Sequence, residues 1–112
     1  KIETEAMYAE KSWGTYTVID VQPGSMTVKI SMKAGEKMSY HMHNEREEVW
    51  TVVSGKGKAI VDAMEQVLRT GDVITIAAGC KHTVEAITPL DMIEVQLGEE
   101  ISVADKIKFP ME

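Results

Sequence analysis

Two of the three histidines of this chain stand close together, in the stretch YHMHNEREEVW at residues 40–50. If KMSYHMH is a strand, His41 and His43 point to the same side, because alternate residues of a strand share a face. Glu48 follows five residues after His43, where a tight hairpin would return its carboxylate toward the imidazoles. His82 follows a further strand pattern and a glycine turn, in DVITIAAGCKH, and an antiparallel barrel can place it on the same interior face.

These four residues offer three imidazole nitrogens and one carboxylate as metal ligands. Such a set suits Zn, Mn, Fe, Co or Ni and leaves coordination positions open for water or substrate. The alternative is that the histidines lie on the surface or are hydrogen-bonded in the core. Because all three fall into one pattern, we interpret His41, His43, Glu48 and His82 as the ligands of one divalent transition metal.

Composition limits the partners that the chain can have. Its 112 residues can bury one core, and 12 Lys and Arg against 18 Asp and Glu make it acidic, with a net charge of -6. No basic cluster is long enough to follow a phosphate backbone, which predicts no nucleic-acid partner. No apolar run approaches the roughly 20 residues of a membrane span, which predicts no membrane partner. Cys80 is the single cysteine, so no internal disulfide can form and we expect a cytoplasmic location.

Period-2 alternation dominates the chain and predicts the elements that must position these ligands. The clearest case is MTVKISMK at 26–33, where apolar and polar residues alternate. Similar short runs separated by Gly, Pro or Asp fill most of the chain, a spacing typical of sandwiches, jelly rolls and barrels. Only residues 1–10 and 101–107 could be helical, and both could equally be strands or tails. We expect a single all-β domain over residues 1–112, with its core from about 13 to 109.

Two stretches resemble the motifs of the cupin superfamily. The segment GEKMSYHMHNEREEVWTVVSG (35–55) is similar to the first motif and fills each of its positions. The segment GDVITIAAGCKHTVEA (71–86) is similar to the second, with Ala77 where proline is usual and Ala86 where asparagine is frequent. The resemblance implies the cupin double-stranded β-helix, a small jelly-roll barrel, with the four metal ligands named above.

A narrower resemblance, to the C-terminal domain of type II mannose-6-phosphate isomerases, covers most of the chain. It implies a metal-dependent aldose–ketose isomerisation of a sugar phosphate through an enediol. Those enzymes usually carry a sugar nucleotidyltransferase domain in front. The 112 residues of this chain are too few to include one, so we expect a free-standing isomerase-like cupin. The similar segments are SWGTY (12–16), VKISMKAGEKMSYHMH (28–43), EEVWTVVSGKGKAIV (47–61), AAGCKHTVE (77–85) and MIEVQLGE (92–99).

The resemblance also implies catalytic residues. Glu94, in MIEVQ, matches a family glutamate and is the first choice for the general base, with Lys29 and Lys33 behind it. Arg46 matches a family arginine just before the ligand glutamate and is expected to contact an anion.

The departures from the family pattern concern phosphate recognition. The family commonly has Arg-Pro at Lys11 and Ser12, arginine at Lys29, glutamine at His41 and a basic arginine at Lys108. Because lysine cannot reproduce the bidentate fork of arginine, we expect a differently built anion site, and an unphosphorylated sugar is an alternative substrate.

Two other functions stay open from the sequence. A non-catalytic, metal-containing sugar-binding cupin would keep the fold but lack a base. A cupin dioxygenase would use three histidines and a glutamate around iron for oxygen chemistry, and fold alone does not decide between these. In each case we expect a small-molecule partner and a homodimer, since a small jelly roll leaves sheet edges to cover and its Met-rich strands offer self-complementary surface.

Overall fold

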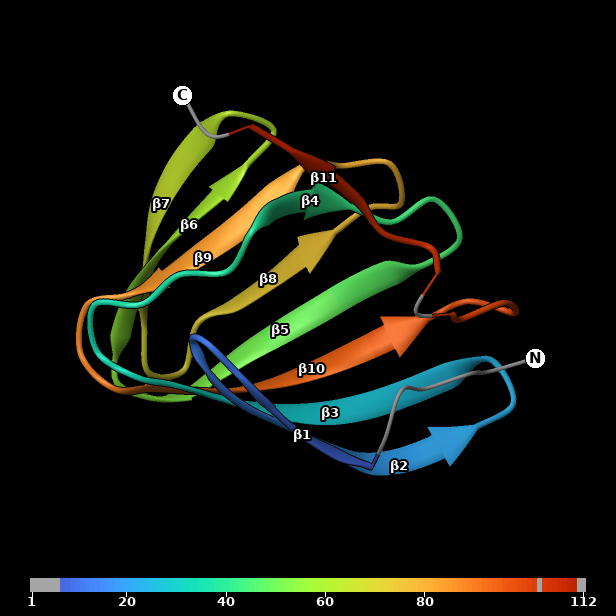
Figure 1. Cartoon of the computed structure of the whole chain (residues 1–112), viewed down its shortest axis with the longest axis horizontal. Coiled ribbons are helices and arrows are strands. Elements are labelled where there is room, and N and C mark those ends of the chain that lie inside the picture. The colour runs from blue at the N-terminus through green and yellow to red at the C-terminus, as the bar shows by residue number, and fades with distance from the viewer. Residues whose placement is uncertain (1–6, 103, 111–112) are drawn as a thin grey trace.

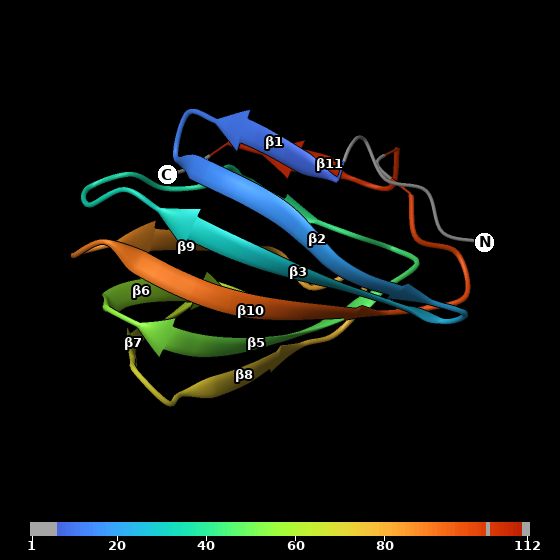
Figure 2. The ribbon, with the colours of Figure 1, turned by 90° about the horizontal axis from the view of Figure 1, so that it is seen from below.

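The backbone forms eleven β-strands and no helix within residues 7–102 and 104–110, the part of the chain that the computed structural model describes. The strands lie in two antiparallel sheets (Figures 1 and 2). In chain order they are β1 (Tyr8–Lys11), β2 (Gly14–Gln22), β3 (Ser25–Met32), β4 (Tyr40–Met42), β5 (Glu47–Ser54), β6 (Lys56–Val61), β7 (Met64–Arg69), β8 (Val73–Ile76), β9 (His82–Ala86), β10 (Leu90–Leu97) and β11 (Ile107–Phe109). The predicted all-β class is confirmed. No helix that could span a membrane occurs among these residues.

The strand order shows how the chain winds. One sheet has the order β1-β2-β3-β10-β5-β8, and the other has the order β11-β4-β9-β6-β7. From β3 onward the chain passes back and forth between the sheets, so that β3, β5, β8 and β10 lie in the first and β4, β6, β7, β9 and β11 in the second. This winding is the predicted cupin double-stranded β-helix. Side chains from both sheets meet in its interior.

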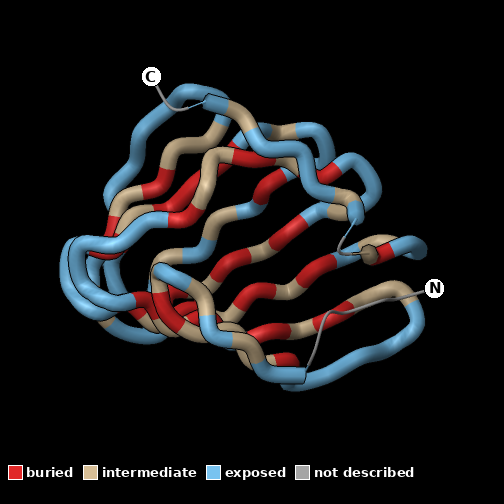
Figure 3. Tube along the Cα trace, in the orientation of Figure 1, coloured by how far each residue is buried: buried red, intermediate tan, exposed pale blue. Residues whose placement is uncertain are grey.

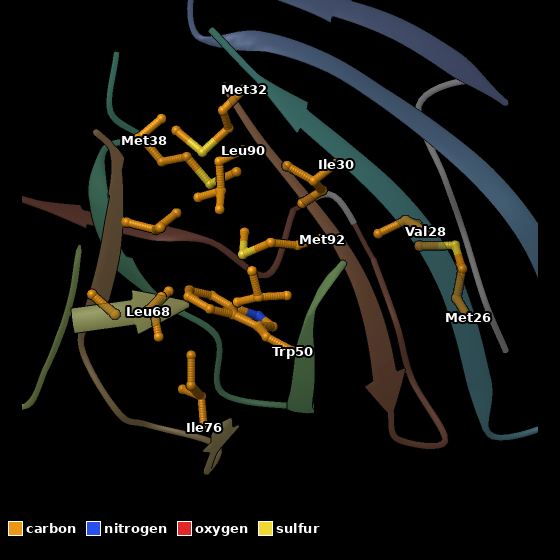
Figure 4. Packing of buried hydrophobic residues seen from close by; sticks show 14 of the residues in the cluster. Met26, Val28, Ile30, Met32, Met38, Trp50, Leu68, Ile76, Leu90 and Met92 are labelled. Carbon is orange, nitrogen blue, oxygen red and sulfur yellow. The ribbon is translucent and has the colours of Figure 1, made fainter. Parts of the chain in front are cut away.

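The predicted alternation of MTVKISMK is confirmed by the core. β3 turns Met26, Val28, Ile30 and Met32 inward, and each is at most 3% exposed (Figure 4). Buried and less buried residues alternate along β3, β5 and β10 (Figure 3). Each fully buried side chain of this size contributes about 1.5–3 kcal/mol to folding. Trp50 on β5 lies at the centre of the same cluster.

One strand, β7, was not predicted from the sequence. Its residues are exposed except for Leu68, so it has no clear period-2 pattern. It forms a hairpin with β6 through Asp62 and Ala63, which have positive φ angles of 49° and 66°. A two-residue turn of this kind favours Asn-Gly or Asp-Gly, and Asp-Ala is a weak signal for it.

Neither segment that could have been helical contains a helix in its described part. Residues 1–6 of the first lie outside the described residues, and Tyr8–Lys11 form β1. In the second, Ile101 is buried in the core and Ile107 begins β11. The strand or tail alternative was therefore correct for the described residues.

Gly55, the last residue of the first motif, has a steric reason to be glycine. It joins β5 to β6 with a φ angle of +92°, a conformation that other residues rarely adopt. A Cβ atom there would collide with the carbonyl oxygen of Pro89. The lack of a side chain at Gly55 thus lets the β5–β6 turn lie directly against the residue that precedes β10.

Candidate metal centre and its cavity

The three histidines converge in the interior between the two sheets. β4 and β9 are paired so that His41 lies opposite His82, and His43 directly follows β4. The side chains are buried, with 6%, 4% and 1% exposure for His41, His43 and His82. Their candidate ligand atoms all lie within 4.8 Å of one another. The prediction that the chain brings its three histidines together is confirmed.

Backbone carbonyls orient all three imidazoles. The acceptors of the Nδ1 atoms are the carbonyls of Ser39 (2.7 Å from His41), Asp105 (2.6 Å from His43) and Cys80 (2.9 Å from His82). Because a carbonyl oxygen can only accept, each Nδ1 carries the proton and each Nε2 presents a lone pair. Metal-binding histidines are typically held in this way.

Burial keeps these imidazoles neutral. It lowers the pKa of His41 to about 3, with added repulsion from His82. It lowers the pKa of His43 to about 4, with added repulsion from Arg46. Burial likewise lowers the pKa of His82. The unprotonated form, which is the one that binds metals, therefore prevails at neutral pH.

Glu48 reaches the cluster from the opposite sheet. The expected hairpin between its strand and that of His43 is wrong, because β4 and β5 belong to different sheets. Its carboxylate still lies 3.3 Å from Nε2 of His43 and 3.7 Å from Nε2 of His82. Trp50 Nε1 and Arg46 Nε each donate to it at 2.9 Å. Burial raises the pKa of Glu48, but the surrounding charges, Arg46 first, outweigh burial and hold that pKa at about 2.

The chemistry of these residues fits a divalent transition metal. Among the described residues, the buried Nε2 of His82 has no hydrogen-bond partner, an arrangement that costs about 1–3 kcal/mol when nothing satisfies the atom. A metal ion shared with the other two imidazoles would satisfy it. Within the described part of the chain, the three histidines form a group that could hold such an ion even without Glu48. The role of Glu48 as a fourth ligand stays a prediction.

β10 adds two polar residues to the same interior. Glu94 and Gln96 are 5% and 2% exposed, and Nε2 of Gln96 donates to Oε1 of Glu94 at 2.8 Å. Burial, together with the nearby charge of Glu48, raises the pKa of Glu94 to about 8. Gln96 was not among the residues predicted from the sequence. Its place two residues after Glu94, on the same strand face, is the signal that could have found it.

These groups open into one cavity of about 360 Å³, a size common for small-molecule sites. His41, His43, Glu48, Glu94 and Gln96 line it. Its cationic lining residues are Lys11, Lys37, Arg46, Lys106 and Lys108. An acidic chain thus gathers five cationic side chains around its buried polar cluster.

Lys29 does not reach this cavity. It is exposed on the outer face of β3, between the inward-facing Val28 and Ile30. The alternation that sends its neighbours into the core sends Lys29 out of it. Lys33, just beyond the same strand, is also exposed and does not line the cavity. Of the predicted catalytic residues, the structure brings Glu94 and Arg46 to the site.

A family model described as the C-terminal region of mannose-6-phosphate isomerase matches residues 2–110. The chain belongs to this family. It is 35% identical over 101 residues to a mannose-1-phosphate guanylyltransferase of Escherichia coli, a match that covers 88% of this chain and 21% of that protein. The chain therefore spans about a fifth of the length of the curated relatives it matches. Membership relates this cupin domain to the C-terminal regions of mannose-phosphate enzymes.

Solved structures agree on the fold of this family member. A conserved protein with a double-stranded β-helix domain from Klebsiella pneumoniae is 16% identical, with a TM-score of 0.74, covering 95% of this chain and 82% of that chain. KdgF from Halomonas sp. is 18% identical, with a TM-score of 0.72, covering 86% and 84%. At such low identities the likeness concerns the fold alone.

Proposed function

We propose that this chain is a metal-dependent, isomerase-like cupin that interconverts an aldose phosphate and a ketose phosphate, with mannose 6-phosphate as the first candidate substrate. The observation that carries the proposal is a single cavity holding a three-histidine cluster, the buried carboxyl group of Glu94 and a cationic lining. Aldose–ketose isomerisation uses these three parts to polarise oxygen, to carry a proton and to anchor an anion. Family membership supports mannose phosphate as the sugar.

His41, His43 and His82, with Glu48, would hold the metal. When bound, a divalent metal would supply Lewis-acid polarisation of the sugar carbonyl. The chain itself orients the ligands: backbone carbonyls hold the imidazole rings, and Trp50 Nε1 holds one oxygen of Glu48. A site held in this way changes little on substrate binding, which favours catalysis.

Glu94 would carry the proton. As a carboxylate it would take the proton from C2 of the aldose and, as the acid, return it to C1, while the hydroxyl proton of O2 passes to O1. A pKa of about 8 leaves both forms accessible near neutral pH, which suits a group that must accept and then donate. Gln96 holds one of its oxygens by a 2.8 Å hydrogen bond and so orients the carboxyl group in the cavity.

The lysines of the cavity favour a phosphorylated substrate. Lys11, Lys37, Lys106 and Lys108 line the same space, although the chain carries a net charge of -6. Cationic side chains gathered around a cleft attract anions and raise their local concentration. We therefore rank the sugar phosphate above the unphosphorylated sugar.

Turnover of mannose 6-phosphate by metal-loaded protein, followed in a coupled assay of fructose 6-phosphate, tests the proposal. Glu94→Gln keeps the size and hydrogen bonding of the side chain but removes its basicity, so turnover should fall by about 10² to 10⁴-fold. The metal content of this variant should not change. Glu47→Gln, on the exposed outer side of the neighbouring strand, is the matched control and should keep full turnover.

The alternatives correspond to other results of the same assay. Metal-loaded protein that binds mannose 6-phosphate but converts neither it nor free mannose would be a sugar-binding module. Oxygen consumption after loading with ferrous iron would instead indicate a dioxygenase. Either result would replace the isomerase proposal.

We also propose a cytoplasmic location, based on the single cysteine. Cys80 is a free thiol, and its Sγ donates to Oδ2 of Asp62 at 2.9 Å. This hydrogen bond raises the pKa of the thiol and keeps it protonated, so it resists oxidation. A reduced thiol suits a reducing compartment.

A further inference from the structure

Arg46 contacts atoms that a metal ion would need. Its Nε donates to Oε2 of Glu48 at 2.9 Å, and its Nη2 donates to Nε2 of His43 at 3.0 Å. The Arg46 side chain is only 11% exposed, so both hydrogen bonds are largely shielded from water. One guanidinium group therefore bridges two of the predicted metal ligands.

This arrangement and metal binding exclude each other at His43. Its Nδ1 donates to the carbonyl of Asp105, so Nε2 has the only ring lone pair. A lone pair that accepts a hydrogen bond from Arg46 cannot at the same time coordinate a metal ion. The guanidinium and a divalent cation would also repel each other strongly where water is largely excluded.

The surroundings of His82 indicate that a metal ion would satisfy the ligand atoms of the site more fully than Arg46 does. Arg46 provides partners for His43 and Glu48, whereas no described residue is a hydrogen-bond partner of Nε2 of His82. A metal ion would satisfy all three imidazoles. Arg46 thus compensates the charge of Glu48 but leaves His82 unsatisfied, which favours an exchange of one cation for another.

We propose that Arg46 is a resident cation of the metal-free site, and that its guanidinium leaves His43 and Glu48 when a metal is taken up. The side chain already lines the cavity, so it can turn into that space without rearrangement of the strands. In this role Arg46 lowers the affinity for metal, because its two hydrogen bonds must break first. The inference rests on the proposed metal site but does not depend on the isomerase reaction.

Nitrogen-15 NMR of the Nε–H groups tests the exchange directly, because the chain has only two arginines, Arg46 and the exposed Arg69. In metal-free protein the Arg46 proton should exchange with water at least about 10-fold more slowly than that of Arg69, since it is buried and hydrogen-bonded. Loading with Zn²⁺ should bring the Arg46 rate close to that of Arg69. An Arg46 signal that keeps its position and its slow exchange at full Zn²⁺ occupancy would overturn the proposal.

Co²⁺ affinity, measured by competition with a chelating dye, gives an independent readout. Arg46→Met removes both donors and should raise the affinity by about 10-fold, the effect of losing a charge-assisted contact. Lys37→Gln removes a positive charge from the same cavity but, among the contacts of the described residues, none joins it to a ligand atom. Lys37→Gln should change the Co²⁺ affinity by less than about 2-fold if the effect of Arg46 comes from its direct contacts and not from its charge alone.

The outcomes separate this inference from the proposed function. Equal gains in Arg46→Met and Lys37→Gln would indicate charge repulsion and would overturn the resident-cation role. Failure of wild-type protein and both variants to bind Co²⁺ and Zn²⁺ would remove the metal site, and the inference with it. Exchange of Arg46 without any sugar-phosphate turnover would leave the inference in place and reject the isomerase.

Discussion

Strands β10, β5 and β8 bury three polar side chains on their inner face, beside the apolar core, and leave apolar side chains partly exposed on their outer face. On the inner face, Glu48, Glu94 and Gln96 are each at most 5% exposed. The outer face of the same strands carries no charge over a patch of neighbouring residues that we call the outer patch. It consists of Val49, Thr51, Val73, Thr75, Ile93 and Val95.

Alternation along a strand therefore decides which residues share a face but not the function of that face. Burying Glu94 disfavours its charged form, as its raised pKa shows, and folding alone offers no reason to place it inside. Our proposals for the two faces are therefore separate: a metal and a substrate on the inner face, and a second copy of the chain on the outer patch.

His82→Ala is the largest expected disturbance of the inner face. It removes one of three imidazoles, so metal affinity should fall by more than about 100-fold, beyond the loss typical of a supporting residue. Metal content after dialysis checks this result. Val73→Ala, on the outer patch, is the control and should retain its metal. A His82→Ala protein that binds metal as tightly as wild type would exclude His82 as a ligand.

In metal-free protein, the pH dependence of stability should change when a carboxylate of the inner face is replaced but not when one of the outer face is replaced. The folded-state pKa of Glu94, about 8, lies above its ordinary value of 4.5, so the stability it contributes is present below pH 4.5 and is lost as pH rises toward 8. Glu94→Gln should remove this loss, which amounts to about a few kcal/mol. Glu47→Gln, on the outer side, should leave it unchanged. Urea unfolding from pH 5 to 9 measures the difference, and parallel curves for wild type and Glu94→Gln would contradict it.

At acidic pH, the histidines should change the stability of the protein with pH in the opposite direction to Glu94. Their folded-state pKa values lie below the ordinary histidine value of 6.5, at about 3 for His41 and about 4 for His43. The unfolded chain therefore binds more protons, and metal-free protein should lose stability as pH falls from about 6.5 toward 4. This loss should persist in Glu94→Gln.

The smallest expected effect concerns assembly through the outer patch, where we propose that two copies meet. Copies with a net charge of -6 repel each other, and an uncharged, self-complementary face is where they can approach most closely. Val95→Glu should weaken a dimer by at least about 10-fold, because the new charges face each other across a two-fold axis. Lys29→Gln, beside the patch on β3, should not. Light scattering across a concentration series checks this, and a wild-type monomer at all concentrations would reject the dimer.

Much of the fold and the centre of the site could be predicted because they depend on local patterns. The period-2 alternation in β3 and the spacing of His41 and His43 are properties of single strands, and each was confirmed. The place of Lys29 outside the cavity also follows from alternation, but the family resemblance had assigned it a catalytic role. Strand β7 was not predicted because almost all of its residues are exposed and so do not alternate between apolar and polar types.

The strand faces, the histidine pattern and the cupin motifs can be read from the amino-acid sequence, since these require only neighbouring residues. The approach of Glu48 to the histidines from the other sheet and the hydrogen bond from Gln96 to Glu94 became visible only in the folded chain. Only it showed that Arg46 occupies the lone pair of His43. The physical reason is that hydrogen bonds, burial and pKa shifts depend on distances between strands far apart in the chain, and winding the roll sets these distances.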